Sequence, residues 1–556
     1  MPVITFDYDD LISLIGKKVG KEELLRKIPM IGAEIDRVED NSISVEFFPD
    51  RPDLLSVEGL ARAMRSFLGI EKGLKRYPLN DAKISMNVDK SVKGIRPFVS
   101  AAVVRNVRMS ENFIISMMEL QEKLHLSVGK DRKKVAIGLH NLDAVTPPFT
   151  YRGVKPGEIS FIPLGMSTEL NLREILQKHD KGIKYAHILE NCDRYPIIVD
   201  KNGNVLSFPP IINGELTAVD LFTENLFVDV TGTDRRAVRN ALNIITAALA
   251  ERGGEAEAVE ITDGGETRKT PDFTPERKKV DTGYASNLLG FDVKEHAEDA
   301  LQKMGYDTKR DGNFINVEIP PWRVDILHPV DIVEDIAIGY GYDRFSPELP
   351  SSMTFGKSLS AKKIHDILIG LKFNEVVTIS LSNKEEQFDK MRLEHEEVVS
   401  IENPISTNHS CMRVSLLPSL LELLSKNRHN ELPQMIYEVG EVVKIEGGMP
   451  VNRTMVAGMK IDARAGFTEC KSMVEAILRN LGIKAEVAEK RSGAFIGGRC
   501  ASVVAAGDGN EMGYFGEIHP EVISNFELEY PVIAFEFGLD RLLPSSSEQN
   551  HRNSRG

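Results

Sequence analysis

Apolar residues recur every three or four positions in several parts of the chain, which is the spacing of a helix with one buried face. The pattern predicts helices over residues 113–124, 235–252, 361–371 and 416–427. Two further amphipathic helices are indicated by apolar sets, which are Leu60, Ala61, Met64, Phe67 and Leu68 in one and Ile332, Val333, Ile336, Ala337 and Tyr340 in the other. Helices are therefore expected along the whole chain.

Runs rich in β-branched and aromatic residues predict strands between these helices. The runs cover residues 99–105, 196–200, 375–381, 434–439 and 532–537. Asn202 and Gly203 stand between two apolar stretches, and this dipeptide is typical of a hairpin turn. Residues 266–279 are rich in Thr, Pro and Lys and are interpreted as a linker. The mixture predicts a multidomain α+β protein.

A segment near the N-terminus recurs later in the chain. Val45-Glu46 and the motif Pro-x-Arg-x-Asp that ends at Asp53 return at Val317-Glu318 and at Asp325. The offset is constant, since 317 − 45 = 272 and 325 − 53 = 272. Both copies then enter an amphipathic helix, so we expect two related small modules, each made of helix, short strand and helix. The alternative is a chance likeness of two amphipathic segments.

These patterns divide the chain of 556 residues, which is too long for a single core. The expected parts are a first module, an inserted α+β domain, a second module, an antiparallel sheet domain flanked by helices, and a polar tail that we expect to be disordered. In that order they cover residues 1–85, 86–265, 270–346, 350–544 and 545–556.

The location expected from the sequence is the cytoplasm. No apolar run is long enough to span a bilayer, and the N-terminus lacks the regions of a signal peptide. The four cysteines, which are Cys192, Cys411, Cys470 and Cys500, are far apart, so neither a disulfide framework nor a zinc site is indicated.

The net charge of −14 limits how the chain could bind nucleic acid. Proteins that hold RNA or DNA by their own surface are usually basic, because phosphate contacts supply most of the affinity. Any contact of this acidic chain with RNA is therefore expected to be local or shared with a more basic partner.

An acidic cluster is the sharpest chemical feature of the second module. Asp331, Glu334 and Asp335 are spaced to share one helix face, opposite the apolar one, and Asp325 comes just before them. Carboxylates gathered in this way suit Mg²⁺, which prefers oxygen ligands. Two alternatives stay open, which are acidic residues stabilising the first turn of a helix and a patch for a basic protein partner.

The repeat favours a binding role for this cluster. At the offset of 272, Asp53 matches Asp325, but Gly59, Arg62 and Ala63 stand where the second module has its other three acids. The module therefore tolerates the loss of three of the four carboxylates, and the cluster is an addition to the second copy.

Several spaced motifs resemble the phenylalanyl-tRNA synthetase beta subunits of the archaeal and eukaryotic type. They are Asp-Arg-Pro-Asp-Leu-Leu-Ser-Val-Glu-Gly at 50–59, Pro-Pro-Trp-Arg-Val-Asp-Ile at 320–326, Val-Asp-Ile-Val-Glu-Asp-Ile at 330–336, Glu-Asn-Pro-Ile-Ser at 402–406 and Met-Arg-Val-Ser-Leu-Leu-Pro at 412–418. They occur in the family's order over nearly the whole chain.

The resemblance implies a fold, partners and a metal. It implies helical, winged-helix-like modules, an editing domain between them, and a last domain like a class II synthetase core without the synthetic site. The family assembles as two alpha and two beta chains, and this complex binds tRNA(Phe), ATP and phenylalanine. It also implies Mg²⁺ at Asp325, Asp331, Glu334 and Asp335, at the contact with the alpha subunit.

The implied editing activity is the hydrolysis of tyrosine wrongly attached to tRNA(Phe). Polar residues in otherwise apolar segments of the inserted domain are candidates for it, and these are His140, Asn213, Glu215, Thr217 and Asp234. Each has a simpler interpretation as a turn or cap residue, such as Asp234 before the helix at 235. The alternative function is a scaffold and RNA-binding subunit without chemistry.

Overall fold

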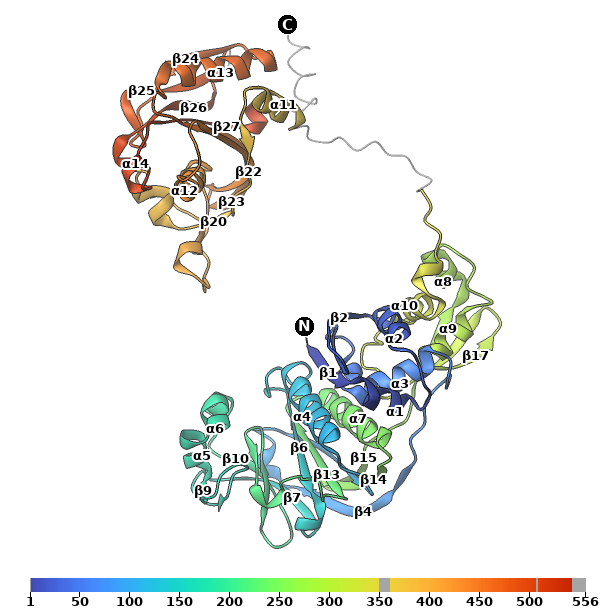
Figure 1. Cartoon of the computed structure of the whole chain (residues 1–556). Helices are drawn as coiled ribbons and strands as arrows, with labels where there is room; N and C mark the ends of the chain where they lie inside the picture. Colours follow the sequence, from blue (N-terminus) through green and yellow to red (C-terminus); the bar gives the residue numbers. More distant parts are fainter. Residues whose placement is uncertain (1, 350–360, 507–508, 543–556) are drawn as a thin grey trace. The chain divides into compact units, whose positions relative to one another are not determined.

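The computed structural model describes residues 2–349, 361–506 and 509–542. The chain forms two compact units, Met1–Leu349 and Pro350–Gly556, which are considered separately (Figure 1). The tail at 545–556, which was expected to be disordered, lies outside the described residues. None of the helices in the described ranges combines the length and the apolar character that crossing a membrane requires.

The first module is a three-stranded antiparallel sheet with three helices. The sheet has the order β1-β3-β2. Its central strand alternates buried and half-buried residues, because one face packs on the helices. The elements are β1 Val3–Asp7, α1 Tyr8–Ile15, α2 Lys21–Lys27, β2 Ala33–Val38, β3 Ser42–Phe47 and α3 Val57–Phe67.

The second module repeats this fold. Its sheet has the order β16-β18-β17, which matches the first sheet strand for strand. Strand β18 begins 314 − 42 = 272 residues after β3, and α10 begins 329 − 57 = 272 residues after α3. The elements are β16 Glu276–Asp281, α8 Thr282–Leu289, α9 Ala297–Lys303, β17 Asp307–Asp311, β18 Phe314–Ile319 and α10 Pro329–Tyr340. The repeated unit is thus strand, two helices, hairpin and helix, which is larger than the predicted helix, strand and helix.

Between the modules lies a ten-stranded mixed sheet of order β12-β11-β10-β7-β4-β14-β5-β13-β6, with β15 beside β14. Asn202 and Gly203 join β10 to β11, as predicted. The strands are β4 Leu79–Val88, β5 Phe98–Arg105, β6 Val135–Asn141, β7 Phe149–Val154, β10 Tyr195–Val199, β11 Val205–Phe208, β12 Ile212–Asn213, β13 Leu226–Gly232, β14 Glu255–Asp263 and β15 Glu266–Thr270. The interpretation of 266–279 as a linker is wrong, because β15 and the start of β16 occupy much of it.

Helices cover this sheet. The long helices α4 Glu111–Leu126 and α7 Arg235–Glu251 confirm the two predicted there, and both contact β6 (Figure 1). The short strands β8 Ser160–Phe161 and β9 Leu170–Asn171 and the helices α5 Leu172–Lys178 and α6 Asp180–Tyr185 form a small flap near β10 and β11.

The sheet domain and the first module share one hydrophobic core. The core combines the helices and strands of the first module with α4, α7, β13 and Trp322. At the end of α7, Arg252 pairs with Asp10 at 2.6 Å and with Glu58 at 2.7 Å. Apolar packing and these paired charges make residues up to 349 a single unit.

The second unit is built on a seven-stranded sheet of order β19-β22-β23-β27-β26-β25-β24, antiparallel except where β19 joins β22. The strands are β19 Asn374–Glu375, β22 Gln434–Glu446, β23 Met449–Ile461, β24 Ala485–Glu489, β25 Phe495–Ala505, β26 Glu511–Ile518 and β27 Val532–Gly538. The helices are α11 Lys362–Gly370, α12 Leu417–Lys426, α13 Phe467–Leu481, α14 Pro520–Asn525 and α15 Leu539–Leu542.

One predicted strand of the second unit is wrong. Residues 375–381 form only the end of β19 and the start of β20 Leu381–Ser382. Val377 and Ile379 are 86% and 65% exposed, so their β-branched side chains do not pack on a sheet. Strand propensity without a buried face did not produce a strand here.

Candidate functional sites

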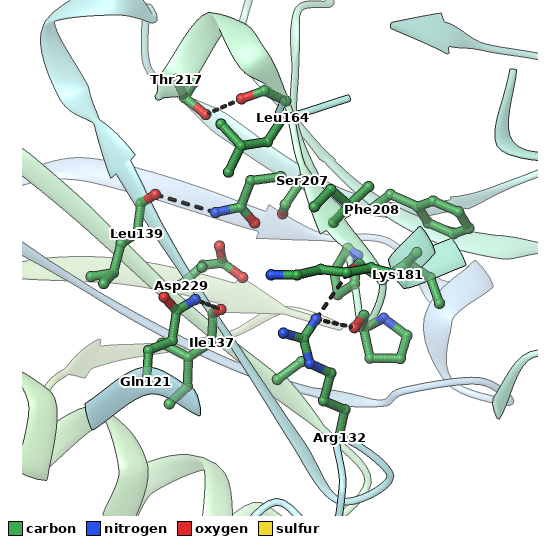
Figure 2. Close-up of a pocket in the computed structure, with 18 of the residues that line it drawn as sticks. Gln121, Arg132, Ile137, Leu139, Leu164, Lys181, Ser207, Phe208, Thr217 and Asp229 are labelled. Atoms are coloured by element: carbon green, nitrogen blue, oxygen red, sulfur yellow. Dashed lines mark hydrogen bonds between the residues drawn. The ribbon is translucent and has the colours of Figure 1, made fainter. Parts of the chain in front are cut away.

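A pocket of about 210 Å³ opens in the inserted domain (Figure 2). We call it the polar pocket, because charged side chains stand among its lining residues. Its walls come from β6, β11, β12, β13 and α4, together with the flap helix α6. Most of the lining is apolar, including Ile137, Leu139 and Phe208. A few polar side chains in such a lining are typical of a small-molecule site.

Asp229 is the central polar residue of this pocket. It lies in the middle of β13, is buried, and stands directly opposite Gly138 of β6. A Cβ at position 138 would lie 2.1 Å from Asp229 Oδ2 and 2.6 Å from His140 Nε2. A glycine is therefore required at 138, because any side chain would occupy the place of the carboxyl group.

His140 connects Asp229 to Thr217. Its Nε2 lies 2.7 Å from Asp229 Oδ2, and its Nδ1 lies 2.8 Å from Thr217 Oγ1. Since an ionised carboxyl group only accepts, Nε2 donates to Asp229, and in the neutral ring Nδ1 accepts from the Thr217 hydroxyl. His140 itself is fully buried behind the lining, whereas Asp229 and Thr217 face the cavity. The imidazole therefore positions the two groups that a ligand would meet.

Two cations and a carboxylate form the other side of the pocket. Arg132 donates to the carbonyl of Ile211 at 2.9 Å and pairs with Glu122 at 2.6 Å. Lys181 lies 3.7 Å from Glu122, and burial together with the charge of Arg132 lowers the pKa of Lys181. Figure 2 draws Arg132, Lys181 and Asp229 around the same space. The pocket thus has an acidic and a basic wall.

The five residues proposed from the sequence separate into two groups. His140, Asn213 and Thr217 meet at the pocket, where Asn213 Nδ2 donates to the carbonyl of Leu139 at 3.2 Å. Glu215 does not line it, because its carboxylate accepts from the backbone of Gly165. Asp234 does not line it either. It caps α7 by accepting from the Ala237 backbone, and it pairs with Lys134.

The residues that sequence reasoning missed include Asp229, Ser207, Arg132 and Lys181. Asp229 carried a signal, since it is an acid within the apolar run Leu-Phe-Val-Asp-Val, where a buried charge needs a special environment. Ser207 is buried in the lining, and its hydroxyl has no hydrogen-bond partner within the described structure. An unpaired buried hydroxyl in a pocket is available to a ligand.

The acidic cluster of the second module is arranged differently from the prediction. Asp335 is buried, not on a face opposite the apolar one. Arg323 donates to Asp325 Oδ2 and to Asp335 Oδ2, both at 2.6 Å, and Tyr306 also donates to Asp335. Burial opposes ionisation of Asp325, but the charge of Arg323 outweighs it and lowers the pKa of that carboxyl. An arginine therefore occupies the position between these two acids.

The other two acids also differ from each other. Asp331 Oδ2 accepts from the backbone of Leu327 and His328, each at 2.7 Å, so it caps the start of α10. Glu334 is exposed and forms no ion pair in the described part of the chain, and its pKa is raised by partial burial and by neighbouring carboxyl groups such as Asp335 and Asp50. Within residues 2–349, 361–506 and 509–542, no group of three acids, histidines or cysteines is arranged to hold a metal ion.

The repeat explains Asp325. In the first module Arg51 donates to Asp53 at 2.8 and 2.9 Å, the same two-residue pair that Arg323 and Asp325 form. The motif Arg-x-Asp is thus a structural clamp of both modules. The Mg²⁺ prediction does not fit the four acids of this chain by themselves, because Asp325 and Asp335 are already neutralised by Arg323.

The cluster lies in a cleft of about 820 Å³ between the two modules. Five acids line it, which are Asp50, Asp325, Asp331, Glu334 and Asp335, and so do the two cations Arg51 and Arg323. Its formal charge is 2 − 5 = −3. The cleft is therefore suited to a basic ligand or partner.

The second unit places Arg413 in a closed network. Its guanidinium donates to Glu438 at 2.9 Å and to Thr378 at 2.7 Å; Arg413 and Glu438 are buried, and Thr378 is half-buried. Since its charge is already paired with a buried carboxylate, Arg413 is not free to bind a phosphate.

Comparison with known proteins places these sites in a family. Models for the B3/4 domain, the tRNA synthetase B5 domain and the phenylalanyl tRNA synthetase beta chain CLM domain match residues 83–261, 278–342 and 347–539. The phenylalanine–tRNA ligase beta subunit of Archaeoglobus fulgidus is 44% identical, over 97% of this chain and 98% of its own. That of Methanosarcina barkeri is 45% identical, over 98% and 100%. The chain belongs to the phenylalanine–tRNA ligase beta subunit family.

A solved structure supports the same conclusion. An N-terminal fragment of the phenylalanyl-tRNA synthetase beta subunit from Pyrococcus horikoshii is 37% identical and aligns with a TM-score of 0.60, over 61% of this chain and 99% of the fragment. As a phenylalanine–tRNA ligase beta subunit, the chain is a component of an aminoacyl-tRNA synthetase. The polar pocket lies within the B3/4 match, and the acidic cluster lies within the B5 match.

Proposed function

We propose that this beta subunit supports the attachment of phenylalanine to tRNA(Phe) and hydrolyses tyrosine wrongly attached to that tRNA. In this proposal it assembles in the cytoplasm with an alpha subunit as two alpha and two beta chains, and the complex binds ATP and phenylalanine. The observation that carries the editing part is the mainly apolar pocket in the B3/4 domain with Asp229 and Thr217 on its surface.

The pocket has groups suited to ester hydrolysis. In this reaction a water attacks the carbonyl carbon, the bond to the ribose oxygen breaks, and the proton of the water reaches that oxygen. Asp229 can accept a hydrogen bond from the water, and His140 fixes Asp229 in place at 2.7 Å. Lys181 and Arg132 supply positive charge for the negative charge that develops on the carbonyl oxygen.

The pocket also has a means to select tyrosine over phenylalanine. The apolar walls accept either ring, whereas Ser207 offers a buried hydroxyl without a partner to a phenol group. A site with a buried polar group rejects a substrate that lacks the matching hydroxyl, because that polar group then stays unpaired. Hydrolysis is therefore expected to spare correctly charged Phe-tRNA.

The test is the lifetime of Tyr-tRNA(Phe) with the assembled complex. Wild-type protein is expected to shorten the half-life of the ester, and Asp229→Asn and Thr217→Val are expected to slow hydrolysis by about 100-fold or more. Asp234→Ala is the matched control, since Asp234 lies outside the pocket. An unchanged half-life with wild-type protein would refute editing and leave the scaffold and RNA-binding role.

The acidic cleft supports a role in assembly. Its formal charge of −3 and the exposed, unpaired Glu334 favour contact with a basic segment of the alpha subunit. Mg²⁺ would fit there only with further oxygen ligands from the partner, because Arg323 neutralises Asp325 and Asp335. We therefore propose Asp331 and Glu334 as the residues with which this chain would hold Mg²⁺ at the cleft.

Association of the two subunits tests this assignment. Asp331→Ala combined with Glu334→Ala is expected to weaken association with the alpha subunit and to remove its dependence on added Mg²⁺. Asp36→Ala combined with Asp40→Ala removes two acids from the first module as a control. An assembly role would be contradicted if the variant with Asp331→Ala and Glu334→Ala loses thermal stability but associates with the alpha subunit as the wild type does.

A further inference from the structure

A second groove on the inserted domain gathers basic side chains away from the polar pocket. It has a volume of about 940 Å³ and no lining residue in common with the pocket. Arg235, Arg236 and Arg239 come from the start of α7, and Arg268 and Lys269 come from β15. Among the described residues that line it, Asp272 is the one acid. This basic groove stands out on a chain whose net charge is −14.

The fold does not explain the three arginines of α7. All three are exposed, and none forms an ion pair within the ranges that the structure describes. Arg235 and Arg236 stand in the first turn, where positive charge is least stable, and the acid nearest to them in sequence, the capping Asp234, is paired with Lys134. A cluster that the fold disfavours and no carboxylate neutralises indicates an anionic ligand.

Other groups of the groove indicate more than a simple ion. Asn243 is 2% exposed, and its amide nitrogen donates to the carbonyl of Asp272 at 2.8 Å. Its amide oxygen has no hydrogen-bond partner in the described structure and calls for a donor, which a phosphodiester group does not supply, because it is fully ionised at neutral pH and carries no O–H. Phe98 and Phe273 add half-buried aromatic rings to the lining.

Arg268 links the two sides of the groove. Its guanidinium donates to the carbonyl of Val99 at 2.8 Å, and burial together with the charge of Arg235 lowers its pKa. Two guanidinium groups so placed repel each other unless an anion lies between them. The walls from α7 and β15 are therefore complementary to one negatively charged ligand.

We propose that this groove binds the sugar–phosphate backbone of tRNA, outside the pocket that takes the amino acid. RNA supplies phosphates for the arginines, ribose hydroxyls or base amino groups for the oxygen of Asn243, and rings for Phe98 and Phe273. The inference rests on the proposed function, which requires tRNA at this domain. A free polyphosphate shares the phosphate chemistry and is the competing source of the ligand.

The test compares two variants of equal charge change in the assembled complex. The groove variant carries Arg235→Gln, Arg236→Gln and Arg239→Gln, and the control variant carries Lys17→Gln, Lys18→Gln and Arg26→Gln, all exposed in the first module. Affinity for a tRNA(Phe) transcript and for inorganic tripolyphosphate is measured between 0.05 and 0.4 M salt. The groove variant is expected to bind tRNA about tenfold or more weakly at 0.1 M, with a salt slope lower by about two to three.

The remaining outcomes separate this inference from the editing proposal. If the groove and control variants bind tRNA with equal affinity, the proposal that the groove binds tRNA is wrong. It is also wrong if the groove variant loses binding of tripolyphosphate but keeps binding of tRNA. The single variant Arg239→Gln is expected to lower the salt slope by about one and serves if the triple variant unfolds. Hydrolysis and tRNA affinity are measured separately, so an absence of Tyr-tRNA(Phe) hydrolysis by the wild type would refute editing, whereas the tRNA affinities of the groove and control variants would still test the groove.

Discussion

At the residue scale, the motif Arg-x-Asp explains why the repeat could be predicted from the sequence and why the arrangement of the acids could not. The motif marked the repeat, and in both modules it forms the same bidentate pair. The spacing of acids predicted a metal cluster, but spacing does not reveal which cation lies nearest. Arg323 stands only two residues before Asp325, and its side chain also reaches Asp335. A charged neighbour in the sequence is thus the first partner to consider.

Arg323→Met tests the clamp. The substitution leaves Asp325 and Asp335 partly or fully buried without their cation, so we expect a loss of about 3–5 kcal/mol in the free energy of unfolding. Arg277→Met, on an exposed strand position, is the control and should change stability by no more than about 0.5 kcal/mol. Denaturant unfolding of the chain measures both, and equal stabilities would contradict the clamp.

His125 gives a prediction on pH. Its Nε2 accepts from the backbone of Ile137 at 2.8 Å, and burial lowers its pKa, although Glu122 opposes this shift and Arg132 adds to it. In the unfolded chain the pKa of the imidazole is about 6.5. Below that pH the unfolded chain takes up a proton on His125, whereas the folded protein keeps the ring neutral. The contribution of His125 to stability is therefore complete above a pH of about 6.5 and is lost as the pH falls.

The measurement is the unfolding midpoint of the wild type and of His125→Gln from pH 8 to pH 5. Glutamine can accept the same backbone hydrogen bond without titrating. The wild type should lose more stability on acidification than the variant, and parallel pH profiles would show that His125 does not contribute.

At the element scale, hydrophobic spacing predicted the helices well, because each buries one apolar face. Helices α4, α7, α11 and α12 lie within two residues of their predicted ends or extend them. Strands were predicted less well, since a strand depends on partners elsewhere in the chain. Residues 375–381 lacked such a partner, whereas β15 found one in β14 despite its polar sequence.

Asp234 belongs to this scale, because it acts on a helix and not in the pocket. Its Oδ1 accepts from the Ala237 backbone at 3.0 Å, which confirms the cap interpretation. Asp234→Ala is expected to cost about 1 kcal/mol of stability. The rate of Tyr-tRNA hydrolysis per folded molecule should be unchanged, and a large loss of rate at full folding would return Asp234 to the list of catalytic candidates.

At the scale of the whole molecule, the pocket could be predicted only in part. His140 and Thr217 were found as polar residues in apolar surroundings, but they are 77 residues apart, and Asp229 joins them from the separate strand β13. Sheet order sets that meeting, since β13 pairs with β6 in a register that puts Asp229 opposite Gly138. Sequence patterns do not contain this order, so the pocket had to be seen in the fold.

The central claim is that this pocket edits, and selectivity tests it most directly. The measurement is the ratio of single-turnover deacylation rates for Tyr-tRNA(Phe) and Phe-tRNA(Phe) with the assembled complex. We predict a ratio of about 100 or more for the wild type, falling toward one in Ser207→Ala, because the phenol then loses its partner. A wild-type ratio near one, or a ratio that Ser207→Ala leaves unchanged, would contradict the assignment of tyrosine recognition to this pocket.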